Sequence, residues 1–220
     1  MQYSLISNSC VSGFVYQLFN PGVHKLFVNY TNPFIASWFP EDDQYVCFCE
    51  RYDYYTSLEP RFGEPSTCLK WQRDTGSFRN LNRKVGIYPV MFLGDIEIHW
   101  IHENNEKLLM QKYRERLKVS QELEPVFFWS DPEMFNIHNE KERCDLLNRF
   151  CNVHYKTLFL TKYQDEAYEG NTSRIVFIPE WKGKSQLDRH QQNFMITWYT
   201  HPQLAELFKT NMYADHPNNI

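Results

Sequence analysis

Acidic and imidazole side chains alternate with apolar ones in residues 94–102, where the sequence is Gly-Asp-Ile-Glu-Ile-His-Trp-Ile-His. An apolar run at 87–93 comes directly before it, so we expect one strand running into a polar end. Side chains two residues apart share a face of a strand, which would point Asp95, Glu97 and His99 the same way. Burying such groups is costly unless they are paired. The pattern therefore predicts either a functional pocket or a solvated edge strand.

A second polar group follows the first expected strand. The apolar residues 3–6 lead into Ser7-Asn8-Ser9-Cys10, and apolar side chains at helical spacing come next. This order indicates a strand, a tight turn and a helix. Cys10 would then lie near the helix N-terminus, where backbone N–H groups stabilise a thiolate or an oxyanion. The alternative is that Ser7, Asn8 or Ser9 caps the helix and Cys10 is a small buried residue.

Strands and helices alternate along the rest of the chain. The expected helices lie at 44–55, 102–120 and 141–150, and the expected strands at 125–129, 156–161 and 174–179. This alternation predicts an α/β fold, a three-layer Rossmann-like domain with a largely parallel sheet. Ligands bind at the carboxyl ends of the strands in such a sheet. Residues 7–10, residues 95–102 and the pair Ser130-Asp131 all fall there, and we expect Ser130 and Asp131 to contact substrate.

Residues 1–220 are expected to form a single domain, because a chain of this length can bury a substantial core. Proline and glycine recur among polar residues over 57–82, which predicts a long loop or a small excursion there. Residues from about 186 are expected to form a C-terminal extension.

Composition argues against some classes of protein. The net charge is -4, the pI is about 6.1 and basic residues are scattered, which argues against a nucleic-acid binder. Aromatic residues make up 17% of the chain, which indicates a packed core and is also compatible with a carbohydrate-stacking pocket. The six cysteines include no CxxC pair, so a zinc site has little support.

The N-terminal residues have no basic region followed by a long apolar run, so no signal peptide is expected. No stretch approaches the roughly 18 consecutive apolar residues of a spanning helix. We therefore expect a cytoplasmic protein with reduced thiols and no transmembrane segment.

Several short motifs, taken in order, are similar to those of a known family. They are Ile6-Ser7-Asn8-Ser9-Cys10 before Gly13-Phe14, Tyr88-Pro89-Val90, Gly94 to His99 with His102, Tyr113-Arg114-Glu115-Arg116, and Ser130-Asp131. Together they resemble the exopolysaccharide biosynthesis proteins catalogued as domain of unknown function nineteen-nineteen, over about residues 3–161. The family is expected to carry a Trp and paired Arg near Tyr113. The resemblance implies a role in building capsules or surface glycans, and no settled reaction.

The turn that holds Asn8 and Cys10 is also similar to one in certain capsule-biosynthesis proteins thought to be acetyltransferases, which pair an Asn and a Cys with a His. By this analogy the reaction is acyl transfer from acetyl-CoA to a sugar hydroxyl. The nucleophile is then Cys10, or Ser7 or Ser9 if the thiol is structural.

In this acyl-transfer hypothesis His99 or His102 is the general base, and Asp95 or Glu97 orients it. Backbone N–H groups of the turn, with Ser7, Asn8 and Ser9, would bind the donor and stabilise the oxyanion. Arg114 and Arg116 are the candidates for the phosphates of the donor.

Two alternatives stay open. In the first, Asp95 and Glu97 hold Mn or Mg against a nucleotide sugar, and the reaction is glycosyl or sugar-phosphate transfer. In the second, the protein binds glycans without catalysis and stacks sugars on aromatic rings. The candidate rings are those of Trp38, Tyr54, Tyr55 and Trp71. In every case the expected partner is a carbohydrate or an activated sugar.

Overall fold

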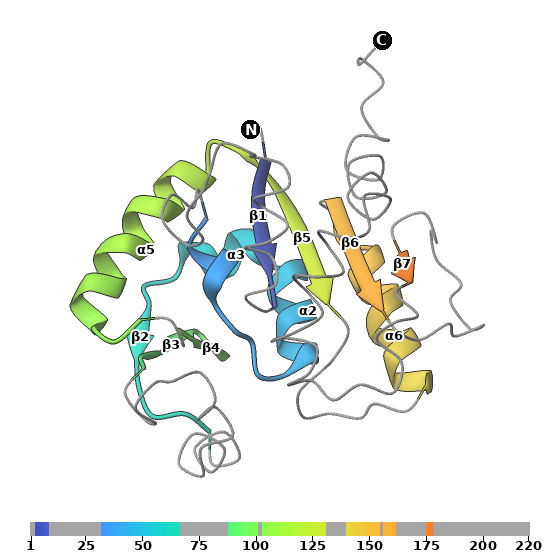
Figure 1. Cartoon of the computed structure of the whole chain (residues 1–220), viewed down its shortest axis with the longest axis horizontal. Helices are drawn as coiled ribbons and strands as arrows, with labels where there is room; N and C mark the ends of the chain where they lie inside the picture. Colours follow the sequence, from blue (N-terminus) through green and yellow to red (C-terminus); the bar gives the residue numbers. More distant parts are fainter. Residues whose placement is uncertain are drawn as a thin grey trace, which may run out of the picture.

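Two separate sheets carry the strands of the computed structural model, which describes residues 3–8, 32–66, 88–100, 103–130, 140–154, 156–161 and 175–177 (Figure 1). The first sheet is parallel, in the order β1 (Tyr3–Ser7), β5 (Glu124–Ser130), β6 (Lys156–Thr161) and β7 (Ile175–Phe177). The second is antiparallel, in the order β2 (Arg61–Phe62), β3 (Val90–Leu93) and β4 (Ile96–His99). The predicted mixed α/β fold with a parallel sheet is thus confirmed.

Strand β5 is buried on both faces. Its residues Val126, Phe127, Phe128 and Trp129 are all at most 1% exposed, although neighbouring side chains of a strand point to opposite faces. A parallel sheet covered on both sides favours such a continuous apolar run over strict alternation. This is why the run at 125–129 predicted a strand correctly.

Helices surround the parallel sheet. They are the 3-10 helix η1 (Pro33–Ala36) and the α-helices α2 (Asp42–Glu50), α3 (Tyr52–Ser57), α5 (Glu106–Ser120) and α6 (Glu140–Cys151). Figure 1 shows α2 and α6 behind the parallel strands, and the two helices contact each other. The helix expected at 44–55 is in fact two helices, because Arg51 leaves the helical conformation at φ -126° and ψ 33°.

Polar contacts fix α2 between the sheet and α6. The Tyr45 hydroxyl donates to the carbonyl oxygens of Ile6 in β1 (3.2 Å) and Phe128 in β5 (2.7 Å). On the other side, the Arg149 guanidinium of α6 pairs with Asp43 and Glu50 of α2. Helix α2 also contacts β4, so it connects the two sheets.

An aromatic cluster fills the space between these elements. Phe34 of η1 is fully buried, and its ring centroid lies within 6.5 Å of five other ring centroids. Those rings belong to Phe39, Phe48, Tyr52, Trp100 and Tyr113. Many of the aromatic residues therefore serve as core, and the cluster forms a rigid support under β4.

The single strand expected over 87–99 is wrong. Strands β3 and β4 form a hairpin in which Leu93 pairs with Ile96, so Gly94 and Asp95 make a two-residue turn. Gly94 has φ +63°, the left-handed conformation that glycine adopts at little cost. Because β4 lies in the antiparallel sheet, the prediction that this segment falls at the carboxyl edge of the parallel sheet is also wrong for residues 95–100, and residues 101 and 102 lie outside the described residues.

Several predictions are not settled by these elements. The excursion expected at 57–82 includes the end of α3 and all of β2, and its part from residue 67 lies outside the described residues. The extension from about residue 186 lies outside them too, and the three-layer Rossmann-like arrangement stays a prediction. Within the described part of the chain, no helix has the length and apolar character needed to cross a membrane.

Candidate functional site

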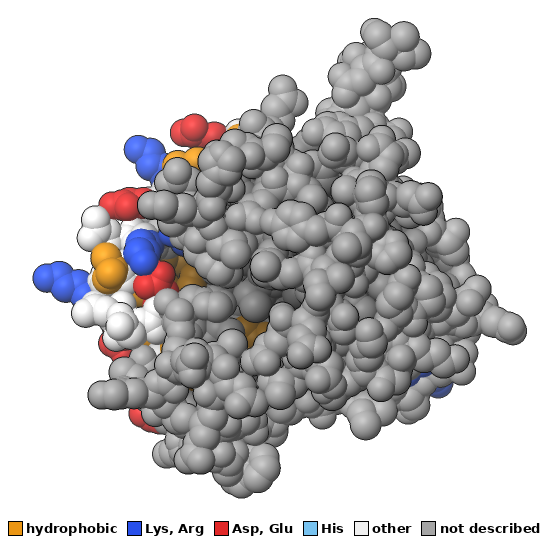
Figure 2. Space-filling model, in the orientation of Figure 1, with side chains coloured by type: hydrophobic (Ala, Val, Ile, Leu, Met, Phe, Trp, Pro, Cys, Tyr) orange, Lys and Arg blue, Asp and Glu red, His pale blue; other side chains and the backbone are white. Residues whose placement is uncertain are grey.

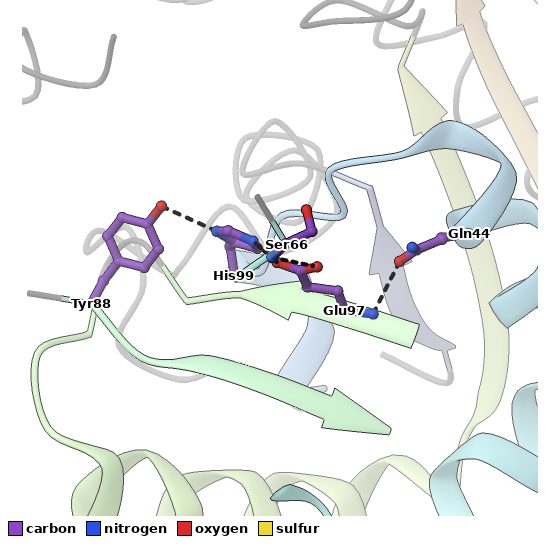
Figure 3. A network of polar contacts seen from close by, with 5 residues as sticks. All are labelled: Gln44, Ser66, Tyr88, Glu97 and His99. Atoms are coloured by element: carbon purple, nitrogen blue, oxygen red, sulfur yellow. Dashed lines mark hydrogen bonds and ion pairs between the residues drawn. The ribbon is translucent and has the colours of Figure 1, made fainter. Parts of the chain in front are cut away.

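Glu97 and His99 form a buried acid–imidazole pair on one face of β4. The Oε1 atom of Glu97 lies 2.8 Å from Nε2 of His99. His99 is 0% exposed and Glu97 is 4% exposed, so the pair is shielded from water (Figure 3). The strand periodicity predicted that these two side chains share a face, and their hydrogen bond confirms it.

The surroundings of Glu97 determine which imidazole nitrogen carries the proton. Both carboxylate oxygens accept the backbone N–H of Ser66, at 3.1 and 3.3 Å. The backbone N–H of Glu97 donates to Oε1 of Gln44, at 3.0 Å, which ties β4 to α2. An ionised carboxylate can only accept hydrogen bonds, so the bond to His99 requires a proton on Nε2.

The other imidazole nitrogen of His99 faces a hydroxyl group. Its Nδ1 lies 3.1 Å from the Tyr88 hydroxyl, which precedes β3 (Figure 3). With the proton on Nε2, Nδ1 is an acceptor and the Tyr88 hydroxyl is the donor. Hydrogen bonds therefore link Glu97, His99 and Tyr88, from a buried carboxylate through the imidazole to a phenol.

Trp38 encloses His99 from the side. Its ring is nearly perpendicular to the imidazole, with centroids 4.9 Å apart, and it is only 5% exposed. The backbone of Trp38 also exchanges two hydrogen bonds with that of His99, at 2.9 and 2.8 Å. The position of the imidazole is thus set by both the backbone and the side chains around it.

The short segment formed by Trp38 and Phe39 joins His99 to the end of β1. Trp38 pairs with His99, and the next residue, Phe39, donates its N–H to the carbonyl oxygen of Asn8 at 3.2 Å. The structure therefore brings Asn8 and His99 to the two sides of one short segment. Sequence reasoning expected the polar turn after β1 to meet the histidine, but Ser9 and Cys10 lie outside the described residues.

Asp95 is not part of this chain of hydrogen bonds. It lies in the exposed hairpin turn, where its Oδ1 accepts the Tyr55 hydroxyl at 3.1 Å. The Cys47 thiol also contacts that hydroxyl, at 3.5 Å, and burial together with these two neighbours raises the pKa of Tyr55 well above its ordinary value. The expected shared face therefore holds for Glu97 and His99 and fails for Asp95, because strand periodicity does not extend into the turn.

The remaining predicted residues lie at several places. Ser7 is buried at the end of β1, opposite Phe128 of β5. Arg114 is exposed on α5 and pairs with Glu59 at 2.6 Å, and Arg116 is half-buried on the same helix. Ser130 is the last residue of β5, but its side chain, like His102 and Asp131, lies outside the described residues.

The described residues offer little to a metal ion. No group of three or more His, Cys, Asp or Glu side chains gathers within them in a way that could hold one. Both oxygens of Glu97 are already hydrogen bonded, and Asp95 is bonded to Tyr55 instead. Holding Mn or Mg between Asp95 and Glu97 would require these bonds to break.

Of the four predicted sugar-stacking rings, two are buried, one is exposed and one lies outside the described residues. Trp38 and Tyr55 are buried, so the prediction that their faces stack on sugars is wrong. Tyr54 is 48% exposed, and the Arg51 guanidinium lies 4.3 Å from its ring centroid. Trp71 lies outside the described residues. Around α5, Figure 2 shows acidic and basic side chains interspersed over the visible described surface.

Sequence reasoning missed three members of the site. The sequence places Tyr88 in a motif but does not predict its contact with His99. Its position before Pro89 and β3 places it across the hairpin from His99. Gln44 and Ser66 are 53 and 31 residues away from Glu97. No local pattern signals contacts over such separations, so only the folded structure shows them.

Comparison with known proteins adds a family. A family model described as Domain of unknown function (DUF1919) matches residues 1–208, nearly the whole chain. A comparison with curated proteins found no match.

Proposed function

We propose that the chain, which belongs to the family described as Domain of unknown function (DUF1919), is a transferase of capsular or surface polysaccharide biosynthesis. Its buried acid–imidazole pair supports this proposal. The reaction is acyl transfer from acetyl-CoA to a sugar hydroxyl, in the cytoplasm. The link to surface glycans comes from the exopolysaccharide proteins that the motifs resemble. The three-layer Rossmann-like arrangement belongs to the same proposal.

The burial of the Glu97–His99 pair is the observation that favours an enzyme over a binding protein. Glu97 and His99 are 2.8 Å apart and almost fully buried. Burying a pair of this kind removes both groups from water, and apolar residues of similar volume often give equal or better stability. Such pairs concentrate at functional sites, where a carboxylate fixes the orientation and tautomer of an imidazole base. The pair is therefore better explained by chemistry than by stability.

The geometry supports general-base chemistry on a hydroxyl group. With the Nε2 proton of His99 held by Glu97, Nδ1 is the basic nitrogen of the ring, and in this structure it faces the Tyr88 hydroxyl at 3.1 Å. A sugar hydroxyl is a poor nucleophile until a base removes its proton, and such catalysis contributes about 10²- to 10⁴-fold. Asn8, beside the same segment as His99, supports the proposed oxyanion turn.

The proposed reaction includes an intermediate carrier of the acyl group. Cys10 is the proposed nucleophile, two residues after Asn8 in the sequence. In that case the acetyl group passes from the CoA sulfur to the Cys10 sulfur and then to the sugar oxygen. Without Cys10 the sugar oxygen attacks the thioester directly, and the base at His99 has the same task.

The competing reaction, metal-dependent glycosyl or sugar-phosphate transfer, has less support from the described residues. It needs Asp95 and Glu97 as ligands, and these two carboxylates face different hydrogen-bond partners. Its donor would be a nucleotide sugar with Mn or Mg.

A ligand screen separates the two reactions. The purified chain is heated with acetyl-CoA, CoA or a panel of nucleotide sugars, each with and without Mn or Mg. A ligand at 100 times its Kd stabilises the folded state by about 2.7 kcal/mol, which raises the Tm by about 5 °C or more. Acyl transfer predicts a metal-independent shift with acetyl-CoA and CoA. A shift only with a nucleotide sugar plus metal would favour glycosyl transfer, and no shift with any donor would favour a glycan-binding protein.

A further inference from the structure

The outer edge of β4 is bound by Trp38 and Gln44 and not by a further regular strand. Strand β4 stands at one end of the antiparallel sheet, so the backbone groups on its outer side point away from β3. There His99 exchanges two backbone hydrogen bonds with Trp38, and the Glu97 N–H donates to Oε1 of Gln44 at 3.0 Å. Each residue of the acid–imidazole pair is therefore attached through its backbone to a group outside its own sheet.

We propose that Gln44 is a positioning residue, which through the backbone of Glu97 fixes the acid–imidazole pair relative to the end of β1. Gln44 acts through Glu97 and does not itself transfer a proton. This inference rests on the proposed acyl transfer, and it adds the residue that sets where the general base stands.

Adjacent residues of α2 attach that helix to both sheets. Gln44 binds β4 of the antiparallel sheet (Figure 3). The next residue, Tyr45, is fully buried, and its hydroxyl lies 3.2 Å from the carbonyl oxygen of Ile6 in β1 and 2.7 Å from that of Phe128 in β5. Because these two side chains leave consecutive positions of one helix, they fix the place of Glu97 relative to the end of β1.

A second attachment runs through the segment formed by Trp38 and Phe39. Trp38 binds the backbone of His99, and the Phe39 N–H donates to the carbonyl oxygen of Asn8 at 3.2 Å. Strand β4 is thus tied to the end of β1 at two points, one at each residue of the pair. Without Gln44, the strand keeps only the attachment at His99. The Glu97 end could then shift, and proton transfer depends on groups held within a fraction of an ångström.

The bond to Glu97 also determines how the Gln44 carboxamide is oriented. A backbone N–H bonds only to an acceptor, so the oxygen of the carboxamide and not its nitrogen faces Glu97. A glutamate at position 44 would offer an acceptor at the same reach, whereas a methionine of similar length would offer none of comparable strength. The role proposed for Gln44 therefore depends on one atom, and substitutions can remove or restore that atom.

The test compares the wild type with Gln44→Met and uses Gln111→Met as the matched control. Gln111 donates to Glu115 at 2.9 Å on the exposed face of α5, so the control also removes one hydrogen bond of a helical glutamine. CoA released from acetyl-CoA is measured by chromatography with glycerol as the hydroxyl acceptor. We expect Gln44→Met to lower kcat by about 10- to 100-fold with KM for acetyl-CoA within about 2-fold, and Gln111→Met to change neither.

Amide hydrogen exchange followed by NMR supplies a readout that does not depend on activity. The Glu97 N–H bonds to Gln44, so Gln44→Met should speed its exchange by about 5-fold or more. The His99 N–H bonds to Trp38 instead and should keep its wild-type rate. An unchanged exchange rate at Glu97 would mean that Gln44 does not hold this backbone, and it would overturn the inference.

Gln44→Glu separates positioning from a general loss of stability, because its carboxylate can accept the Glu97 N–H. The comparison uses the plateau of kcat at high pH, since a second carboxylate near Glu97 favours the protonated form of His99. We expect kcat on that plateau to return to within about 5-fold of the wild type, together with slow exchange at Glu97. Slow exchange with a kcat as low as that of Gln44→Met would refute the positioning role.

The remaining outcomes are distinct. If Gln44→Met speeds exchange at Glu97 but keeps kcat within about 3-fold of the wild type, the inference fails and the proposed acyl transfer stands. If the wild type releases no CoA, the proposed function fails and the inference fails with it. Should Gln44→Met not fold, Gln44→Asn keeps the amide but is one methylene shorter. A positioning role then predicts a kcat at least about 5-fold lower, and a wild-type kcat would refute it.

Discussion

Replacing His99 by Phe should lower the free energy of unfolding, and replacing its partner Glu97 by Met as well should recover part of that loss. His99→Phe keeps a ring against Trp38 but leaves the Glu97 carboxylate buried with only the Ser66 N–H as a partner. Glu97→Met leaves two donors, Nε2–H of His99 and the N–H of Ser66, without their acceptor. The double variant leaves no buried charge at all.

The size of each loss in stability follows from the burial of the Glu97 and His99 side chains. Leaving a buried group without its hydrogen-bond partner costs about 1–3 kcal/mol, and more for a charged group, which places His99→Phe near 3 kcal/mol because Glu97 keeps the Ser66 bond. Glu97→Met should cost about 2 kcal/mol, mainly because the buried Nε2–H of His99 loses its acceptor. The double variant should lose only about 1–2 kcal/mol, because Ser66 is exposed and its N–H can bond to water. The three values imply a coupling of about 3–4 kcal/mol between the two residues.

Urea unfolding followed by tryptophan fluorescence measures this cycle, and Trp38 reports on the site itself. For a chain of this size, about 3 kcal/mol corresponds to a fall in Tm of about 6–12 °C. Glu115→Gln on the exposed face of α5 is the control and should change stability by less than about 0.5 kcal/mol. If the two single losses simply add in the double variant, to within about 0.5 kcal/mol, the buried pair is not coupled and the reasoning is refuted.

Three further predictions concern the fold. Gly94→Ala should lower the free energy of unfolding by about 1–2 kcal/mol, because φ is +63° and the new Cβ would lie 3.2 Å from Leu58 Cδ1. A loss below about 0.5 kcal/mol in urea unfolding would argue against that turn. Burial raises the pKa of the Cys49 thiol and of the Tyr45 hydroxyl. Their contribution to stability is therefore complete below the unfolded-state pKa values, about 8.5 for Cys and about 10 for Tyr, and is lost as pH rises above them. The free energy of unfolding should fall as pH rises from about 8.5 to about 11, and a flat profile would contradict this. Arg149→Met should cost only about 0.5–1 kcal/mol, less at high salt, because its side chain is 41% exposed; a loss above about 2 kcal/mol would show that solvent does not weaken the pair.

The sequence predicts the parallel sheet well because burial there leaves a local signature. Residues 126–129 are apolar on both faces, and the helix that becomes α5 begins at Asn105, whose side chain accepts the N–H of Leu108 at 2.9 Å. The second sheet does not follow from the apolar pattern alone, because an apolar run on each side of Gly94-Asp95 also fits one continuous strand. A Gly-Asp pair between two apolar runs is itself a hairpin signal, and the left-handed φ of Gly94 shows why.

The site was predictable in part, because two of its residues follow a local pattern in the sequence. Glu97 and His99 lie two residues apart, so strand periodicity places them on one face, and the hairpin preserves that relation within β4. The Tyr88, Ser66 and Gln44 contacts depend on how the hairpin packs against α2 and the segment after β2. Those contacts are made by tertiary packing over 11 to 53 residues, which periodicity cannot report.

The most direct measurement of the central claim is the acyl-transfer rate of Glu97→Gln. This change keeps the shape of the side chain and removes the charge that holds and stabilises the His99 imidazole. The account predicts that release of CoA from acetyl-CoA falls by about 100-fold or more, while Glu115→Gln keeps the wild-type rate. A folded Glu97→Gln that turns over acetyl-CoA as fast as the wild type would contradict the account.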